Sequence, residues 1–269
     1  MYLKYWGLTA APFRQTLDPS LCFATPMHDE ALARLWFLVD GRRRCGLLAG
    51  GAGVGKSMLL ETLAAQLRRA GLAVARMSLL GVNAEEMLRD LATAWGATPP
   101  TGAAVSDLGR IVADRLAEFR LLGTHAVALL DDADEAIPDV LAKVVRLSQA
   151  DPAQRPAVTM ILAARSESIA RVGTRWLELT DLKVELTPWN SADTGRFLEH
   201  RLALGGRKSP VFAGEAIERL HQYTHGVPRN LLQLADLCLV AGAAASCDLI
   251  DAETIESVYY ELGVVETLV

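Results

Sequence analysis

The sequence contains no uninterrupted apolar run long enough to cross a membrane. Although 51% of its 269 residues are hydrophobic, charged residues interrupt every candidate before the roughly 20 apolar positions that a spanning helix needs. The N-terminal segment MYLKYWGL also lacks a basic stretch followed by an apolar core, which is the pattern of a secretory signal. We therefore expect a soluble protein that acts in the cytoplasm.

Cysteine and net positive charge are scarce as well. The four cysteines have no paired spacing, which predicts reduced core thiols rather than a zinc site or a disulfide framework. They are Cys22, Cys45, Cys238 and Cys247. The net charge of −5 gives no overall attraction to nucleic acid. Basic patches such as Arg42–Arg44 and Arg68–Arg69 are either solvated surface or local contacts to phosphates.

A glycine-rich motif is the most specific feature that is present. It matches G-x-x-x-x-G-K-[ST], between an apolar segment typical of a buried strand and a segment with helical periodicity. Its residues are Gly50, Gly51, Ala52, Gly53, Val54, Gly55, Lys56 and Ser57, followed by Met58. Such a loop directs main-chain N–H groups and a helix N-terminus at a polyphosphate. We expect Lys56 to contact the β- and γ-phosphates of ATP and Ser57 to bind Mg²⁺.

A second motif is the apolar run from His125 to Leu130 that ends in Asp131 and Asp132. This is the pattern of a buried parallel strand whose C-terminal end carries functional groups. We expect Asp131 to hold Mg²⁺ or its waters beside the glycine-rich loop, and Asp132 to orient the attacking water as the catalytic base.

The rest of the chain alternates predicted strands and helices, and then becomes helical. After the loop helix Ser57–Ala70, the predicted strands are 73–79, 156–164 and 183–186, and the predicted helices are 84–95, 107–122, 138–149, 191–204, 213–224, 228–243 and 251–262. No internal repeat or low-complexity tract interrupts this order. The pattern predicts an α/β domain followed by a helical part.

Taken together, these motifs resemble AAA+ ATPases, in particular the ExeA/GspA type of secretion ATPase. The segments that carry the resemblance are Tyr5–Leu8, Pro12–Phe13, Asp18–Pro19, His28–Leu32, Asp131–Asp134, Leu186–Trp189 and Gly226–Arg229. Transposition regulators of the TnsC, TniB and MuB type share much of the pattern. The resemblance implies a P-loop NTPase fold, with a three-layer αβα domain around a parallel sheet over residues 1–188 and a helical lid over 189–269.

In this family the N-terminal segment, here residues 1–40, wraps near the adenine. The resemblance therefore implies a base pocket that includes Trp6, Gly7, Leu8 and Phe13. The alternative is that these apolar residues only pack in the core.

The chain departs from the family at the catalytic base. Family members have Asp-Glu-Ala-Gln where this chain has Asp131–Asp134, so the base is one methylene shorter. Because a displacement of roughly 1 Å can cost about a hundredfold in rate, we expect slow hydrolysis or a switch-like role. Glu135 lies beyond the strand end, where we expect it to be solvated.

A second departure lies at the end of the next strand, where the family has a glutamine that senses the γ-phosphate. Arg165 occupies this position. It either contacts phosphate as a catalytic residue or forms an ion pair with Glu167 or Asp131 that holds the strand ends together.

Further arginines are assigned through the resemblance. Arg229, beside the helix-initiating Pro228, corresponds to the lid arginine that reaches the γ-phosphate, although it could instead be a surface residue at a helix start. Arg175 is our candidate for the arginine finger supplied by a neighbouring subunit, with Arg171 as the alternative. A strict alignment would place Leu179 at that position.

One histidine pair has the spacing of metal ligands. His221 and His225 are four residues apart on a predicted helix, but no carboxylate or cysteine follows at ligand spacing, which favours a packed or exposed pair.

These observations predict a Mg²⁺-dependent ATPase that forms a homo-oligomeric ring or filament with ATP and assembles or regulates a partner complex. Through the resemblance we expect a secretion or envelope setting, with the protein cytoplasmic or held at the inner membrane by its partner. One alternative is an ATP-dependent DNA-binding regulator of transposition. Another is a nucleotide-switched scaffold with slow or no hydrolysis.

Overall fold

The computed structural model describes residues 2–150 and 156–266, which fall into two compact units. The α/β unit comprises Pro26–Ala52 and Lys56–Leu186. The helical unit comprises Met1–Thr25, Gly53–Gly55 and Thr187–Val269. The α/β unit therefore ends two residues before the expected boundary at 188.

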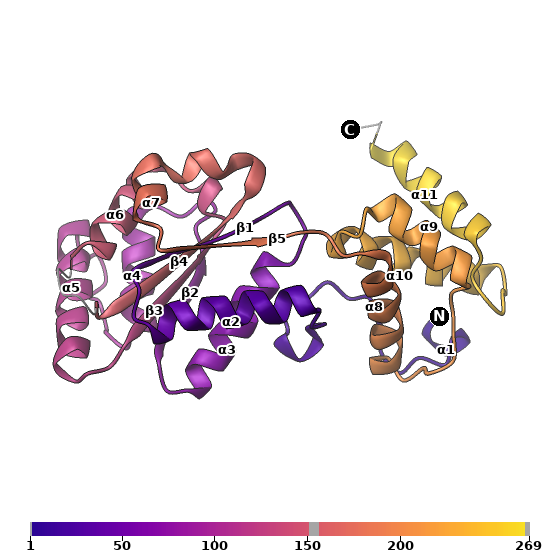
Figure 1. Cartoon of the computed structure of the whole chain (residues 1–269), viewed down its shortest axis with the longest axis horizontal. Helices are drawn as coiled ribbons and strands as arrows, with labels where there is room; N and C mark the ends of the chain where they lie inside the picture. The colour runs from indigo at the N-terminus through magenta and orange to yellow at the C-terminus, as the bar shows by residue number, and fades with distance from the viewer. Residues whose placement is uncertain (1, 151–155, 267–269) are drawn as a thin grey trace. The chain divides into compact units, whose positions relative to one another are not determined.

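A five-stranded parallel sheet forms the centre of the α/β unit, which confirms the predicted fold class (Figure 1). Its strand order is β2-β3-β4-β1-β5. The strands are β1 (Cys45–Gly50), β2 (Ala73–Ser78), β3 (Ala126–Asp131), β4 (Val158–Arg165) and β5 (Leu182–Leu186). Every residue of β1 and β3 is buried, as expected for a parallel sheet covered on both faces.

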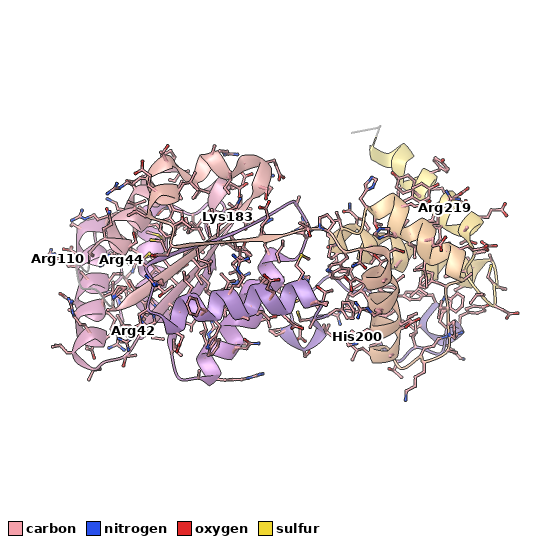
Figure 2. The ribbon with its side chains drawn as sticks, in the orientation of Figure 1. Arg42, Arg44, Arg110, Lys183, His200 and Arg219 are labelled. Carbon is pink, nitrogen blue, oxygen red and sulfur yellow. The ribbon has the colours of Figure 1, made fainter. Side chains whose placement is uncertain are left out.

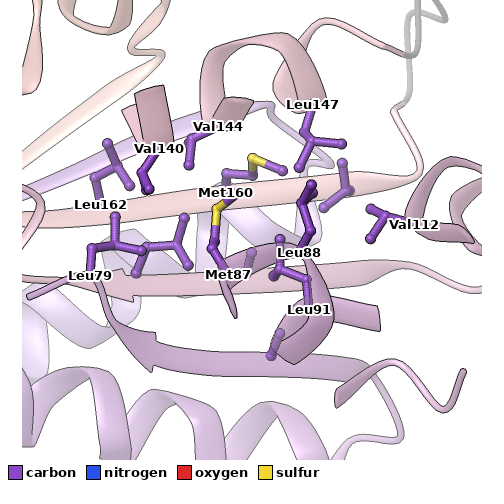
Figure 3. Packing of buried hydrophobic residues seen from close by; sticks show 14 of the residues in the cluster. Leu79, Met87, Leu88, Leu91, Val112, Val140, Val144, Leu147, Met160 and Leu162 are labelled. Carbon is purple, nitrogen blue, oxygen red and sulfur yellow. The ribbon is translucent and has the colours of Figure 1, made fainter. Parts of the chain in front are cut away.

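Helices cover both faces of this sheet. They are α2 (Pro26–Asp40), α3 (Lys56–Arg69), α4 (Ala84–Ala94), α5 (Val105–Leu121), α6 (Pro138–Ser148) and the short α7 (Thr174–Leu179), with 3₁₀ turns at Ala133–Glu135 and Ser166–Val172. Helix α3 packs on β1, β2 and β3, whereas α4 packs on β2 and α6 packs on β4. Figure 3 shows the core beneath α4, α5 and α6, where Met87, Val112, Val144 and Met160 are each fully buried.

Helix α2 is absent from the elements that the sequence predicts. Its apolar residues Ala31, Leu35, Leu38 and Val39 have the spacing of one helical face, and all four are buried. The resemblance assigned this stretch to a segment that wraps near the adenine, whereas the structure places it against α3 and β5.

The helical unit contains α1 (Tyr2–Tyr5), a 3₁₀ turn at Pro19–Leu21, α8 (Ser191–Leu204), α9 (Gly214–Thr224), α10 (Pro228–Ala244) and α11 (Ala252–Glu266). The N-terminal segment belongs to this unit, not to the α/β unit as the sequence led us to expect. The indole of Trp6 donates to the carbonyl oxygen of Leu239 at 2.8 Å. The buried Arg201 donates from Nε to the carbonyl oxygen of Pro12 at 2.6 Å, so hydrogen bonds fasten the segment to α8 and α10.

Within the described ranges, no helix has both the length and the apolar character needed to cross a membrane. Two of the four cysteines, Cys45 and Cys238, are buried. Burial raises the pKa of Cys45 to about 11 and that of Cys238 to about 12, so both thiols are neutral near pH 7.

Candidate functional site

The glycine-rich loop and the acidic residues meet at the carboxyl edge of the sheet. Strand β1 leads into the loop at Gly50, and β3 ends at Asp131. Gly53 and Gly55 have φ angles of +76° and +106°, a backbone region that residues with a Cβ rarely adopt. The sequence pattern therefore predicted the loop correctly, because its glycines lie where the turn requires them.

Lys56 begins α3 and turns back over the loop. Its Nζ donates to the carbonyl oxygens of Gly50 and Gly51, at 2.8 Å each. Burial lowers the pKa of the Lys56 ammonium, while nearby carboxylates, Asp131 first among them, act in the opposite direction. A half-buried ammonium group next to the loop suits a phosphate that binds both the ammonium and the main-chain N–H groups of the loop.

Asp131 is buried, with 2% of its surface exposed, and contacts the residues expected beside it. Its carboxylate accepts a hydrogen bond from the Ser57 hydroxyl and one from the Asp132 N–H at 3.1 Å. Burial raises the pKa of Asp131, and the bond from Ser57 opposes this. A hydroxyl and a carboxylate are oxygen ligands of the kind that Mg²⁺ uses together with waters and substrate phosphates, so Ser57 and Asp131 suit that ion.

Asp132 adopts a left-handed backbone conformation, with φ 52° and ψ 39°. The Ser78 hydroxyl, at the end of β2, donates to Asp132 Oδ2 at 2.6 Å. Ser78 is in register with Asp131, so the pairing of β2 with β3 places its hydroxyl beside the acids. Sequence reasoning missed Ser78, although a polar residue at the end of a predicted strand was an available signal.

Arg165 forms ion pairs, but with partners other than those expected. Its Nε lies 2.7 Å from Asp134 Oδ2, its main-chain N–H donates to Asp134 Oδ1 at 3.2 Å, and its guanidinium also pairs with Glu135. Glu167 and Asp131 are not its ion-pair partners among the described residues. The left-handed turn at Asp132 directs the chain so that Asp134, not Asp131, meets the end of β4.

Glu135 is not simply solvated, as we had expected. Its side chain is 33% exposed and pairs with Arg171 at 3.5 Å as well as with Arg165. Arg175 is 61% exposed, and its ion pair among the described residues is with Glu178 of the same helix, at 3.2 Å. Arg171 is 58% exposed, so both arginines are accessible to a neighbouring molecule, but Arg171 pairs with Glu135, which also pairs with Arg165.

Other candidate residues lie in the helical unit. The main-chain N–H of Arg229 donates to the carbonyl oxygen of Gly53 at 3.2 Å, and both residues are grouped in that unit. Trp6, Leu8 and Phe13 are buried, with exposed fractions of 1%, 7% and 2%. Arg207 lies over the Trp6 ring, 5.4 Å from its centroid. These contacts favour the packing alternative for the three apolar residues.

Of the histidine pair, His221 is partly buried and His225 is exposed at the end of α9. His221 Nδ1 lies 2.9 Å from the hydroxyl oxygen of Thr194, and His225 ends α9 with a φ of 50°. Over residues 2–150 and 156–266, no group of three or more histidine, cysteine or acidic side chains is arranged to hold a metal ion.

The basic patches make structural contacts. Arg42, labelled in Figure 2, donates from Nη2 to the carbonyl oxygen of Gly123 at 2.8 Å. The N–H of Arg44 donates to Asp181 at 3.0 Å, and Arg68 lies 4.0 Å from Glu61. The side chains of Arg42 and Arg68 thus have partners within the fold.

Comparison with known proteins supports the expected resemblance. Residues 39–172 match the family described as AAA domain. The chain is 23% identical to General secretion pathway protein A of Aeromonas hydrophila over 98% of its own length, and it spans 49% of that relative. Its fold is similar to that of the Aeropyrum pernix ORC2 protein in ADPNP-ADP complexes, with a TM-score of 0.69 and 17% identity over 93% of this chain and 71% of that one. It is also similar to that of the Aeropyrum pernix ORC1 protein in complex with DNA, with a TM-score of 0.66 and 19% identity over 90% of this chain and 67% of that one.

Proposed function

Residues 39–172 form an AAA domain within a chain related to General secretion pathway protein A, and from this premise we propose that the protein binds and hydrolyses Mg·ATP. The observation that carries this proposal is the convergence of Lys56, Ser57 and Asp131 at one edge of the sheet. A cation, a hydroxyl and a carboxylate lie there beside a loop with main-chain donors, which is the set that phosphoryl transfer requires.

Each residue has a distinct role in the proposed reaction. The loop N–H groups and Lys56 bind and orient the phosphates, and Ser57 and Asp131 hold the metal ion or its waters. The metal ion supplies positive charge that offsets the negative charge developing on the transferred phosphoryl group. Asp132 accepts a proton from, or orients, the attacking water. Its hydrogen bond with Ser78 fixes the carboxylate at a defined position.

Slow turnover is part of the proposal. The side chain of Asp132 is shorter than that of the glutamate in the resembling family, and its carboxylate accepts a hydrogen bond from Ser78 at 2.6 Å. Arg165 forms ion pairs with Asp134 and Glu135. The Ser78 bond occupies one acceptor position of the Asp132 carboxylate, and the short side chain holds the remaining positions back from the water. If hydrolysis were absent altogether, the protein would act as a scaffold that is switched by nucleotide binding alone.

The test is steady-state phosphate release with a parallel titration of a fluorescent ATP analogue. We expect the wild-type chain to release phosphate slowly and Asp132→Asn to retain nucleotide affinity while losing about a hundredfold or more in rate, because the base acts on the transition state. Asp139→Asn, an exposed acid of α6 paired with Lys143, is the matched control and should change neither quantity. Equal rates for Asp132→Asn and wild type would remove Asp132 from the mechanism.

We further propose that nucleotide drives self-assembly into a ring or filament, with Arg175 supplied to the site of a neighbour. Its pairing within α7 supports this choice over Arg171, whose partner Glu135 also pairs with Arg165. Light scattering should show larger species with a non-hydrolysable ATP analogue, and Arg175→Ala should lose turnover more than nucleotide affinity. A chain that stays monomeric at micromolar concentration with saturating nucleotide, with and without duplex DNA, would contradict the shared site.

The relative's name supports a secretion or envelope setting, in which the chain acts in the cytoplasm and reaches the inner membrane through a protein partner. The chain spans about half of that relative, so this setting is a proposal about the shared part only. Co-purification with tagged chain would identify the partner and its compartment.

A second candidate function is ATP-dependent DNA binding in the regulation of transposition. The observation that favours it is the fold similarity to a protein solved in complex with DNA. Against it are the net charge of −5 and the contacts of the Arg42 and Arg68 side chains within the fold. A duplex titration with and without ATP at two salt concentrations decides between the candidates, since phosphate contacts weaken steeply with salt.

A further inference from the structure

Arg76 is a cation beside the carboxylate assigned to Mg²⁺, and nothing in the proposed reaction uses it. It lies on β2, two residues before Ser78, with 17% of its side chain exposed. Its Nη2 lies 3.4 Å from Asp131 Oδ2, and its Nε lies 3.1 Å from Glu61 Oε2 on α3. The guanidinium is therefore shared between two acids, through its Nε and Nη2 atoms.

The two acids differ in what else they contact. Asp131 has 4% of its side chain exposed and also binds Ser57 and the Asp132 N–H. Glu61 is 25% exposed, and its other cation, Arg68, is 4.0 Å away. Glu61 is also the nearer partner of Arg76. A buried carboxylate needs a counter-charge, and Arg76 supplies it here.

We propose that Arg76 is a positioning residue that occupies Asp131 as a substitute cation and moves wholly onto Glu61 when a divalent metal ion arrives with nucleotide. This inference rests on the proposed nucleotide site. Arg76 holds the Asp131 carboxylate in place, and its positive charge opposes the incoming metal ion. Glu61 lowers this opposition, because it gives the guanidinium a second acidic partner, on α3.

The proposal predicts opposite effects from two charge removals. Arg76→Gln removes the competing cation and should tighten metal binding about fivefold, because like charges a few ångströms apart repel even near a protein surface. Glu61→Gln removes the partner that draws Arg76 away and should weaken metal binding about threefold. A purely structural role of the three residues would weaken binding in both variants.

The experiment is a Mn²⁺ titration of the full chain at pH 8, with protein in excess over ADP, followed through the electron paramagnetic resonance signal of unbound Mn²⁺. Arg68→Gln is the matched control, since Arg68 also pairs with Glu61 but has no ion pair with Asp131 among the described contacts. It should bind Mn²⁺ as the wild type does. ADP affinity in EDTA should be unchanged in all variants.

The outcomes separate the two levels of the account. If wild-type chain binds ADP neither in EDTA nor with Mn²⁺, the proposed nucleotide function fails, and the role of Arg76 fails with it. If wild type binds ADP and Mn²⁺ but the two variants shift in the same direction, or neither shifts, only the role of Arg76 is overturned. Since Glu61→Gln leaves Arg76 in place, it tests the proposal even if Arg76→Gln folds poorly.

Discussion

The two edges of the central sheet both carry polar groups, but they use them differently. At the amino edge, the exposed Asp181 accepts hydrogen bonds from the N–H groups of Arg44 and Cys45, at 3.0 Å each. The buried His125 lies 2.9 Å from the Thr159 hydroxyl, which donates to the carbonyl oxygen of Arg43 at 2.5 Å. These interactions run largely to main-chain groups.

At the carboxyl edge the polar groups contact other side chains. Asp131 is bonded to Ser57 and Arg76, and Asp132 to Ser78. A side-chain partner can be exchanged for a ligand without disturbing a strand, whereas Asp181 holds two main-chain N–H groups where β1 begins. We therefore expect the amino edge to contribute stability and the carboxyl edge to hold the proposed nucleotide site.

Lys56→Ala should give the largest effect, and it should be on binding alone. Loss of a charge-assisted contact to phosphate costs about 1.5–3 kcal/mol or more, equivalent to at least a tenfold loss of ATP affinity. The thermal midpoint should change little, because Lys56 contacts only loop carbonyls. Fluorescent-nucleotide titration beside Lys143→Ala, a surface lysine of α6, checks this. Unaltered affinity in Lys56→Ala would mean that the loop does not bind phosphate.

Asp132→Glu should raise the rate of phosphate release severalfold, up to about a hundredfold, because the longer side chain moves the carboxylate closer to the water. The left-handed backbone at this position is less favourable for glutamate than for aspartate, so we also expect a loss of about 1 kcal/mol in unfolding free energy. Phosphate release and chemical denaturation measure the two effects. A slower variant would show that the distance of the carboxylate does not limit hydrolysis.

Asp181→Ala should lower the free energy of unfolding by about 0.5–1.5 kcal/mol without changing ATP affinity, because it removes the acceptor of two main-chain donors, one just before β1 and one at its first residue. Urea denaturation and nucleotide titration on the same samples test the separation of the two edges. Asp139→Ala controls for loss of an exposed acid. A large loss of nucleotide affinity in Asp181→Ala would show that the amino edge of the sheet also contributes to nucleotide binding.

His125 should make stability depend on pH without affecting binding. Burial lowers the pKa of His125 to about 4 from an ordinary value of 6.5. Below pH 6.5 the His125 side chain of the unfolded chain binds a proton, whereas that of the folded chain binds one only near pH 4. The free energy of unfolding therefore decreases as the pH is lowered through this window, by up to about 1.4 kcal/mol per pH unit. His125→Gln should flatten this part of the profile, measured as unfolding midpoints from pH 7 downward. An unchanged profile would show that His125 is not the group responsible.

Local patterns in the sequence predicted the elements and the chemistry of the carboxyl edge. Apolar runs identified β1 and β3, and the fixed spacing of the loop identified Lys56 and Ser57, because each depends on neighbours in the chain. The partners of Arg165 were not predictable, because a left-handed aspartate at position 132 redirects the chain and no local pattern requires it. The hydrogen bond from Trp6 to Leu239 joins residues 233 positions apart, which no periodicity reports.

The amino edge was missed for a related reason. Asp181 directly precedes β5 and Thr159 lies in β4, and the sheet order β3-β4-β1-β5 brings them to the main-chain groups that they contact. Ser78 and Arg76 depend in the same way on the pairing of β2 with β3. The functional site was thus predicted where its residues are close in sequence, and missed where strand pairing completes it.

Amide hydrogen exchange of the wild-type chain, with and without Mg·ATP, tests the contrast between the two edges most directly. We expect nucleotide to slow exchange of the amides over Gly50–Ser57 and at Asp132. The amides of Arg44 and Cys45, already bonded to Asp181, should exchange at the same rate in both states. Slowed exchange at the amino edge, with no change over the loop, would contradict the account.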